Sequence, residues 1–141
     1  MRLYLDSSAL VKRYVLAPGT GDVVDLCRRC EEGGSSVVGG PEVISAVRRR
    51  LDEGALKRKA YGRLRSDLAA DLEQATIVPV DHAVLRRSIE AIERGSLRAL
   101  DAIHVASALV SACDLFVSAD ARQSRTARLM GLDVAEIAAG P

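Results

Sequence analysis

The chain has 141 residues, of which 48% are hydrophobic and 28% charged, and its formal net charge is +1. This length fits a single domain over residues 1–141, and the composition excludes disordered, coiled-coil and collagen-like chains. No apolar run is long enough to cross a bilayer, so we expect no membrane association. The first apolar stretch is interrupted by Asp6 and Lys12, which makes it a poor signal peptide and predicts a cytoplasmic protein.

The distribution of basic residues along the chain is more informative than the net charge. Seventeen of the 20 basic residues are Arg, the better side chain for binding phosphate, and several are adjacent, as in the run 48–50. Such clusters also occur simply as solvated helix faces. With three Tyr, one Phe and no Trp, a surface that stacks several nucleic-acid bases is not expected.

The first part of the chain predicts two short strands and two helices. Residues 3–5 form an apolar run, and a helical pattern then continues from about residue 9 to Pro18. A second helix is expected over 21–32, closed by Gly33 and Gly34, and a second strand over 36–38.

The middle of the chain predicts three helices and a strand. Pro41 is suited to the first turn of one helix, and leucines four residues apart predict a long helix over 56–72. A third strand is expected over 76–80, ended or placed at an edge by its proline. Asp81 then caps a helix whose inward face is expected to hold four aliphatic residues, Val84, Leu85, Ile89 and Ile92.

The last third alternates in the same way. Residues 99–112 are apolar nearly all round and predict a central buried helix, followed by a strand over 115–117. A helix over 120–130 and a short fifth strand from 133 complete the pattern. Short apolar strands separated by helices predict a parallel α/β sheet covered on both faces, with its ligand crevice at the carboxyl ends of the strands.

Four carboxylates fall where that crevice is expected. Asp6 and Asp120 follow strands, Glu42 follows the second strand after a Gly-Gly-Pro turn, and Asp101 lies in the apolar helix. Carboxylates about 5 Å apart repel by about 3 kcal/mol at an effective dielectric of 20, and a divalent cation reverses that cost. We therefore expect these four acids to form one site for Mg²⁺ or Mn²⁺.

Each of these acids also has a structural interpretation. Asp6 is placed to cap a helix, Glu42 to stabilise a helical first turn, and Asp120 to form a capping box with Gln123. Asp101 is the hardest to explain this way, because it is expected to be buried with only Arg98 nearby as a partner.

Other polar and sulfur-containing side chains also have two interpretations. Ser7, Ser8 and Ser118 stand beside the acids and are suited to bonding the carboxylates or to turns. His104 is expected to be a core histidine with satisfied hydrogen bonds. Cys27 and Cys30 have the spacing of a metal or redox pair but are expected to act as small apolar residues on a helix.

Four segments carry a resemblance to a known family: YLDSSALVKRY at 4–14, PEVISAVRRR at 41–50, LDAIHVASA at 100–108 and VSAD at 117–120. Together, in this order, they resemble the PIN-domain family, and most of all the VapC-type ribonuclease toxins of bacterial toxin–antitoxin pairs. The resemblance covers essentially the whole chain.

The resemblance implies a three-layer α/β/α fold with a short, mostly parallel five-stranded sheet. It implies a Mg²⁺- or Mn²⁺-dependent endoribonuclease in which Asp6, Glu42, Asp101 and Asp120 are catalytic and bind metal, with Ser7 and Ser118 in support. It leaves open whether Glu42 binds metal or orients water. It further implies an RNA substrate, a homodimer, and a cognate antitoxin protein that blocks the cleft.

Basic residues expected around the site would guide a nucleic-acid backbone. They are Lys12, Arg13, Arg98, Arg122 and Arg125.

Three rival functions compete with a ribonuclease. A DNA nuclease with the same metal chemistry stays open, because nothing in the sequence recognises a 2′-hydroxyl. A catalytically silent RNA- or protein-binding module is the second alternative. A phosphatase with an aspartate nucleophile is disfavoured, since Ser8 stands where its second aspartate would be.

Overall fold

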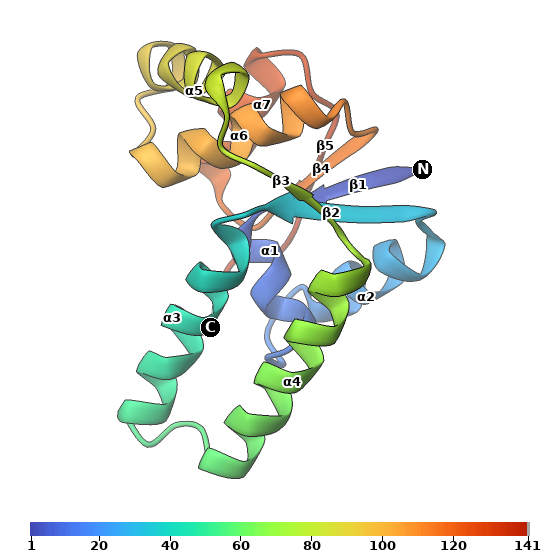
Figure 1. The fold of residues 1–141 in the computed structure, drawn as a ribbon, viewed down its shortest axis with the longest axis vertical. Helices are drawn as coiled ribbons and strands as arrows, with labels where there is room; N and C mark the ends of the chain where they lie inside the picture. Colours follow the sequence, from blue (N-terminus) through green and yellow to red (C-terminus); the bar gives the residue numbers. More distant parts are fainter. Residues whose placement is uncertain (141) are drawn as a thin grey trace.

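The computed structural model describes residues 1–140 and contains one five-stranded sheet in which every strand pairing is parallel (Figure 1). Its strands are β1 (Arg2–Leu5), β2 (Glu32–Ser36), β3 (Thr76–Val78), β4 (Leu115–Ser118) and β5 (Val134–Glu136). They lie in the order β3-β2-β1-β4-β5, so the first strand is central. The predicted parallel α/β fold with five strands is confirmed.

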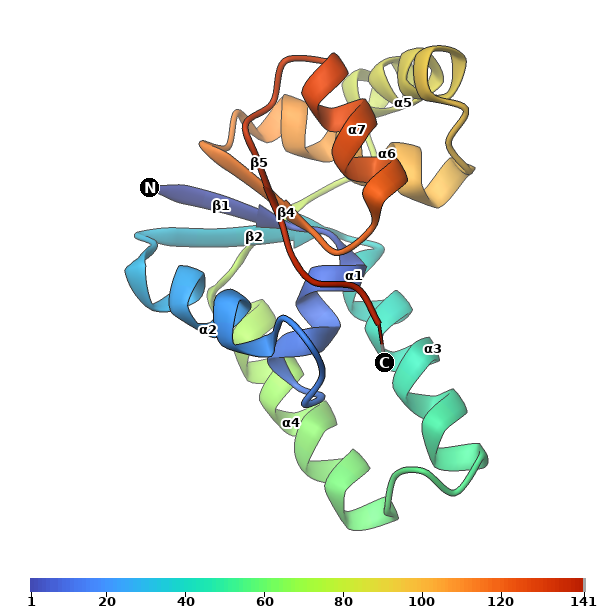
Figure 2. The ribbon, with the colours of Figure 1, turned by 180° about the vertical axis from the view of Figure 1, so that it is seen from behind.

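Helices cover both faces of this sheet (Figures 1 and 2). One face carries α1 (Ser7–Leu10), the short 3-10 helix η1 (Val11–Arg13), α2 (Thr20–Arg29), α3 (Gly39–Asp52) and α4 (Arg58–Gln74). The other carries α5 (His82–Gly95), α6 (Ala99–Ser111) and α7 (Ala121–Leu129). Within residues 1–140, none of these helices is both long and apolar enough to span a membrane.

The two-sided cover explains the residue pattern of the central strand. Leu3 and Leu5 pack into the core beneath α1–α4, whereas Tyr4 packs into the core beneath α5–α7. Successive side chains of a strand point to opposite faces, so an uninterrupted apolar run is what a strand buried on both faces requires.

The second strand differs from the sequence prediction. It begins at Glu32, four residues earlier than expected, and α2 ends at Arg29. Gly33 and Gly34 are therefore strand residues and do not terminate a helix. A Cβ atom on Gly34 would lie 2.6 Å from the carbonyl oxygen of Thr76, so the glycine permits the close approach of β3.

The inward face of α5 also differs from the prediction. Val84 is buried as expected, but the other three aliphatic residues are not: Leu85, Ile89 and Ile92 are 44%, 57% and 38% exposed. The buried face of α5 instead consists of Val84 and two small residues, Ser88 and Ala91. The small side chains let α5 pack closely against α6 and α7.

Smaller differences concern helix ends. The first helical stretch is short, because α1 and η1 together end at Arg13, and α3 begins at Gly39, two residues before the predicted start. Other signals are confirmed. Asp81 caps α5 by accepting a hydrogen bond from the Val84 amide at 2.9 Å, and Gly131, with φ of 97°, follows α7.

Candidate active site

The site lies at the carboxyl ends of the central strands. From β1 the chain moves outward on one side to β2 and β3 and then crosses to β4 and β5 on the other, so β1 lies at the point where the strand order reverses. Ligands of open parallel sheets bind at such points. Asp6 directly follows β1, Asp120 follows β4 by one residue, and Glu42 and Asp101 lie in the first turns of α3 and α6.

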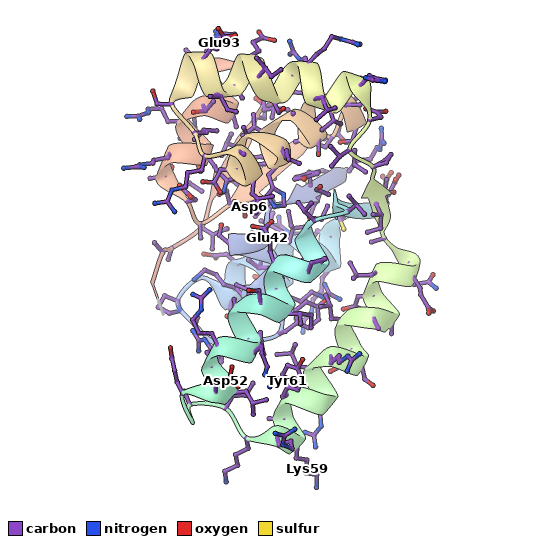
Figure 3. The ribbon with its side chains drawn as sticks, turned by 60° about the vertical axis from the view of Figure 1, so that its left-hand side comes forward. Asp6, Glu42, Asp52, Lys59, Tyr61 and Glu93 are labelled. Carbon is purple, nitrogen blue, oxygen red and sulfur yellow. The ribbon has the colours of Figure 1, made fainter. Side chains whose placement is uncertain are left out.

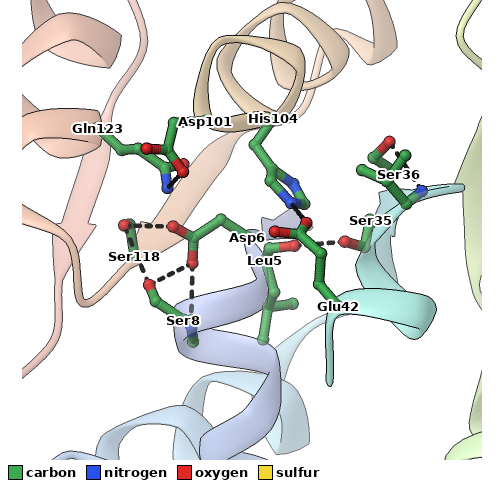
Figure 4. Close-up of polar contacts among 12 residues, drawn as sticks. Leu5, Asp6, Ser8, Ser35, Ser36, Glu42, Asp101, His104, Ser118 and Gln123 are labelled. Carbon is green, nitrogen blue, oxygen red and sulfur yellow. Dashed lines mark hydrogen bonds and ion pairs between the residues drawn. The ribbon is translucent and has the colours of Figure 1, made fainter. Parts of the chain in front are cut away.

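Asp6 is fully buried and held by three donors (Figure 4). Its Oδ1 accepts from Ser8 Oγ at 2.7 Å and from the Ala9 amide at 2.9 Å, and its Oδ2 accepts from Ser118 Oγ at 2.6 Å. Burial raises the pKa of the Asp6 carboxyl, and the Ser118 and Ser8 hydrogen bonds oppose that shift by favouring the charged form. The predicted role of Asp6 as a helix cap is confirmed, and the same carboxylate lies at the end of β1 where the site is expected.

The serines beside the acids have distinct positions. Ser118 donates to Asp6 and accepts from the Asp120 amide at 3.0 Å, which links the ends of β1 and β4. Ser8 donates to Asp6 and accepts from the Ala119 amide at 2.9 Å. Ser7 makes no side-chain hydrogen bond within the described residues. The support expected from Ser7 and Ser118 therefore comes from Ser8 and Ser118.

Glu42 is oriented by a histidine from another helix. His104 is fully buried in α6, its Nε2 lies 2.6 Å from Glu42 Oε1, and its Nδ1 lies 2.9 Å from the hydroxyl of Tyr4 on β1. An ionised carboxylate only accepts hydrogen bonds, so Nε2 carries a proton, and in the neutral ring Nδ1 accepts from Tyr4. The expectation of a satisfied core histidine is met, but one of its partners is a candidate site residue.

Asp101 lies at the rim of the site. Its Oδ1 accepts from Gln123 Nε2 at 3.0 Å, and Arg98 is near enough to lower its pKa without forming an ion pair in the described residues. Burial is the largest cause that raises the pKa of Asp101, followed by the negative charges of Asp120 and Glu42. Asp101 is only half-buried, which corrects the expectation of a buried acid; Asp6 is the buried member.

Asp120 caps α7, accepting from the amides of Arg122 at 2.8 Å and Gln123 at 3.3 Å. The predicted capping box is incomplete, because the Gln123 side chain donates to Asp101 and not back to the helix cap. Gln123 is almost completely buried, and its Oε1 has no hydrogen-bond partner within residues 1–140. Gln123 therefore links the two acids: its backbone amide donates to Asp120 and its side-chain amide donates to Asp101.

The donor chemistry of the site fits a hard divalent cation. Asp6, Glu42, Asp101 and Asp120 supply only oxygens, and two of them raise the pKa of a third, as expected for acids gathered without a compensating charge. Within residues 1–140, no group of three or more acidic, His or Cys side chains is arranged to hold a metal ion. Mg²⁺ usually takes one or two carboxylates and keeps several waters, so it does not require such a group.

The basic residues predicted to surround the site fall into two groups. Lys12 is 4% exposed and donates to the carbonyl oxygens of Pro18 and Gly140, and Arg13 pairs with Asp71 at 3.1 Å, so both are engaged within the fold. The other three are exposed and form no ion pair within the described residues. These are Arg98, Arg122 and Arg125.

The sequence predicted the positions of the four acids in the fold, but not the residues that hydrogen-bond to two of them. His104 was found but assigned to the core, although its spacing of three from Asp101 places both on one side of α6. Gln123 was interpreted only as a capping partner, and Tyr4 only as an apolar strand residue. No local sequence signal indicates that Tyr4, His104 and Glu42 meet.

The sequence profile of the PIN domain matches residues 3–129. This match covers most of the chain and agrees with the parallel α/β sheet and the acidic side chains at its carboxyl edge. The chain belongs to the PIN-domain family. No functionally curated protein matches the sequence.

Solved structures with the same fold include toxin–antitoxin proteins. VapBC2 from Rickettsia felis, solved with a DNA fragment of its promoter, superposes with a TM-score of 0.67 at 15% identity, covering 97% of this chain and 99% of that chain. VapC20 of Mycobacterium tuberculosis, a toxin that cleaves the sarcin-ricin loop, gives 0.67 at 14% identity over 87% and 93%. DNA-bound VapBC from Salmonella typhimurium gives 0.67 at 13% over 96% and 98%.

Proposed function

We propose that this PIN-domain chain is a Mg²⁺- or Mn²⁺-dependent endoribonuclease that acts in the cytoplasm as the toxin of a toxin–antitoxin pair. The observation that carries the proposal is geometric: acids from separate segments gather at the carboxyl ends of the central strands. Ser118 donates to Asp6 and accepts from the Asp120 amide. Gln123 donates its side chain to Asp101 and its backbone amide to Asp120. Similar folds in VapC20 and in VapBC complexes support the choices of RNA and of an antitoxin partner.

A divalent ion bound to these carboxylates would supply the charge that stabilises a phosphodiester under attack by water. Asp101 and Asp120 are half-buried, and in this proposal they would hold the ion. Asp6 would be the buried acid of the site, and hydrogen bonds from Ser8 and Ser118 fix its orientation. Glu42 is kept in one orientation by His104, which suits either binding the ion or accepting a proton from the attacking water.

We propose that residues 1–141 form a single domain and that two copies of the chain form a homodimer. Leu85, Ile89 and Ile92 form an exposed aliphatic stripe along α5, at spacings of four and three residues on one side of the helix. A self-complementary apolar stripe is suited to a two-fold interface with a second copy of this chain.

The experiment is cleavage of RNA by purified protein with Mg²⁺, with EDTA, and with EDTA followed by excess Mg²⁺. We expect cleavage only when free Mg²⁺ is present, and a loss of 100-fold or more in Asp101→Asn. Asp67→Asn removes an exposed acid of α4 and is the matched control, which should cleave normally. Activity that survives in Asp101→Asn, or in EDTA, would contradict the proposal.

A second arm of the same experiment separates the alternatives. Single-stranded DNA of matched sequence is offered under identical conditions, and we expect RNA to be cleaved preferentially. Preference for DNA would replace the ribonuclease by a deoxyribonuclease. Binding of RNA without cleavage, unchanged by Asp101→Asn, would identify a silent binding module.

A further inference from the structure

The near-neutral net charge conceals a strongly basic segment. Between residues 48 and 65 there are eight basic and two acidic residues, a net charge of +6. The remaining chain has 12 basic and 17 acidic residues, a net charge of −5. The basic residues are the triplets 48–50 and 57–59 together with Arg63 and Arg65.

This segment lies at the outer end of one helical hairpin. The hairpin of α3 and α4 extends away from the sheet, and its loop lies at one end of the long axis of the molecule (Figures 1 and 2). Figure 3 shows α3 running from Glu42 beside the sheet to Asp52 near the tip, with Lys59 projecting outward there. We call residues 39–74 the arm.

The basic side chains of the arm are not used within the fold. Arg48 pairs with Asp52 at 3.1 Å, and none of the other seven forms an ion pair or a side-chain hydrogen bond in the described residues. Arg50 is partly exposed and the other six are exposed. A surface salt bridge contributes little to stability, so neither pairing nor packing explains why these charges are gathered here.

Helix geometry connects the arm to the acidic site. Arg49 follows Glu42 by seven residues, which is nearly two full turns, so it lies on the same side of α3 about 10 Å further along the axis. Arg50 lines a pocket of about 240 Å³ together with Ser8 and Ala119, and Ser8 is a hydrogen-bond donor to Asp6. Arg49 therefore lies about 10 Å from Glu42 along α3, and Arg50 lines a pocket next to the serine that holds Asp6.

A phosphate-rich ligand is the chemistry that fits this arrangement. The acids of the site repel a polyanion, so a substrate with a phosphate backbone needs attraction from an adjacent surface of the same chain. Arg binds phosphate through two parallel hydrogen bonds. The Arg triplet about two turns beyond Glu42 on α3, followed by further Lys and Arg toward the outer end of the arm, matches an extended chain of phosphates. We propose that the arm binds the backbone of single-stranded RNA that leaves the acidic site along α3. This inference rests on the proposed function only for its choice of RNA as the polyanion.

The test measures binding, so that it does not depend on cleavage. Binding of a fluorescent single-stranded RNA of about 20 nucleotides to the full chain is measured in EDTA at several salt concentrations. The arm variant carries Arg49→Gln, Arg50→Gln and Arg58→Gln. The matched control carries Arg28→Gln, Arg29→Gln and Arg86→Gln, three exposed arginines of α2 and α5 that form no ion pair in the described residues.

We expect the arm variant to bind RNA about 10-fold or more weakly at 0.1 M salt. Its slope of log Kd against log salt should fall by about 2, since each lost phosphate contact on a single strand removes about 0.7. The control variant should change neither quantity, although its net charge is lowered equally. Equal losses in both variants, or no loss in either, would overturn the inference.

Three further outcomes separate this inference from the proposed function and from binding of an acidic protein. If the wild type cleaves RNA and the arm variant still binds and cleaves it normally, the proposed function stands and the arm inference fails. If the wild type does not cleave RNA but only the arm variant loses RNA binding, the arm inference stands and the proposed function fails. Competition by an acidic polypeptide such as polyglutamate as strong as that by RNA would assign the arm to an acidic protein instead.

Discussion

His104 Nε2 lies 2.6 Å from Glu42 Oε1, although the two residues are 62 positions apart and belong to helices on opposite faces of the sheet. The ring is completely buried, and its second nitrogen meets the hydroxyl of Tyr4 on the central strand. One side chain therefore fixes the direction of a site carboxylate relative to the sheet. Partners of this kind commonly orient the groups that contact metal or substrate.

Tyr4→Phe tests this relationship with a minimal change. The variant keeps the ring that stacks on Phe116 but removes the hydroxyl, which leaves His104 Nδ1 buried without a partner. We expect a loss of about 1 kcal/mol in the free energy of unfolding and a lower kcat with little change in KM. Urea denaturation and steady-state cleavage measure the two effects. A variant destabilised to this extent with normal kcat would show that the hydroxyl serves stability alone.

Ser118→Ala tests the support of the buried acid. The Ser118 hydrogen bond favours the charged form of Asp6, so its removal should raise the pKa of that carboxyl further. If ionised Asp6 is required, the acidic limb of the pH profile of kcat/KM moves to higher pH. Ser7→Ala is the matched control, because Ser7 adjoins Asp6 but makes no side-chain hydrogen bond in the described residues. An identical shift in both variants would contradict this assignment.

The raised pKa of Asp101 predicts how stability depends on pH in EDTA. The folded protein holds this proton more tightly than the unfolded chain does. The resulting stability is fully present below the ordinary Asp pKa of about 3.9 and is lost as the pH rises through the raised pKa. Asp101→Asn removes that loss, so its Tm relative to wild type should be higher at pH 7 than at pH 4.

Asp67→Asn controls for the change in net charge, because it removes an exposed acid that has no hydrogen-bond partner in residues 1–140. Thermal unfolding of the three proteins at both pH values gives the comparison. A Tm difference between Asp101→Asn and Asp67→Asn that is the same at pH 4 and pH 7 would refute the prediction.

The exposed stripe on α5 predicts the oligomeric state. Ile89 is 57% exposed at the middle of the stripe, and Ile89→Arg should convert a dimer of twice the 15.0 kDa chain mass into a monomer. The mass is measured by light scattering after gel filtration. Leu16→Arg changes a residue that is 89% exposed before α2, and it should leave the mass unchanged. A wild type that is monomeric at high concentration would remove the homodimer from the proposal.

The sequence predicted Asp6 and Asp120 at strand ends because these positions depend on local signals. A strand end followed by Asp6 or Asp120 can be seen in a few residues, and parallel strands bring such ends to one edge. The face of α5 could not be chosen in this way. Leu85, Ile89 and Ile92 are as regular a helical stripe as the buried one, and packing against other helices selected the face with smaller residues.

The partners of the acids lay beyond sequence reasoning for a related reason. Gln123 bonds Asp101 over 22 positions and His104 bonds Glu42 over 62, and such contacts depend on side-chain directions set by the whole fold. The start of the second strand was missed because a glycine pair usually ends a helix. Here Gly34 is required because its backbone pairs closely with Thr76 on β3, a contact that the local sequence does not reveal.

Gly34 gives the sharpest test of the sheet. In Gly34→Ala the new Cβ would meet the Thr76 carbonyl oxygen at 2.6 Å, and that backbone is held in the pairing of β2 with β3, so it cannot move freely. We expect a loss of about 1–3 kcal/mol in the free energy of unfolding, as for other overpacked positions. Gly33→Ala is the matched control, since the nearest atom to its Cβ is Cys30 Sγ at 3.9 Å. Urea denaturation should therefore show a normal or slightly raised midpoint for Gly33→Ala and a clearly lowered one for Gly34→Ala. Equal midpoints would mean that β3 does not approach β2 as closely as this pairing requires.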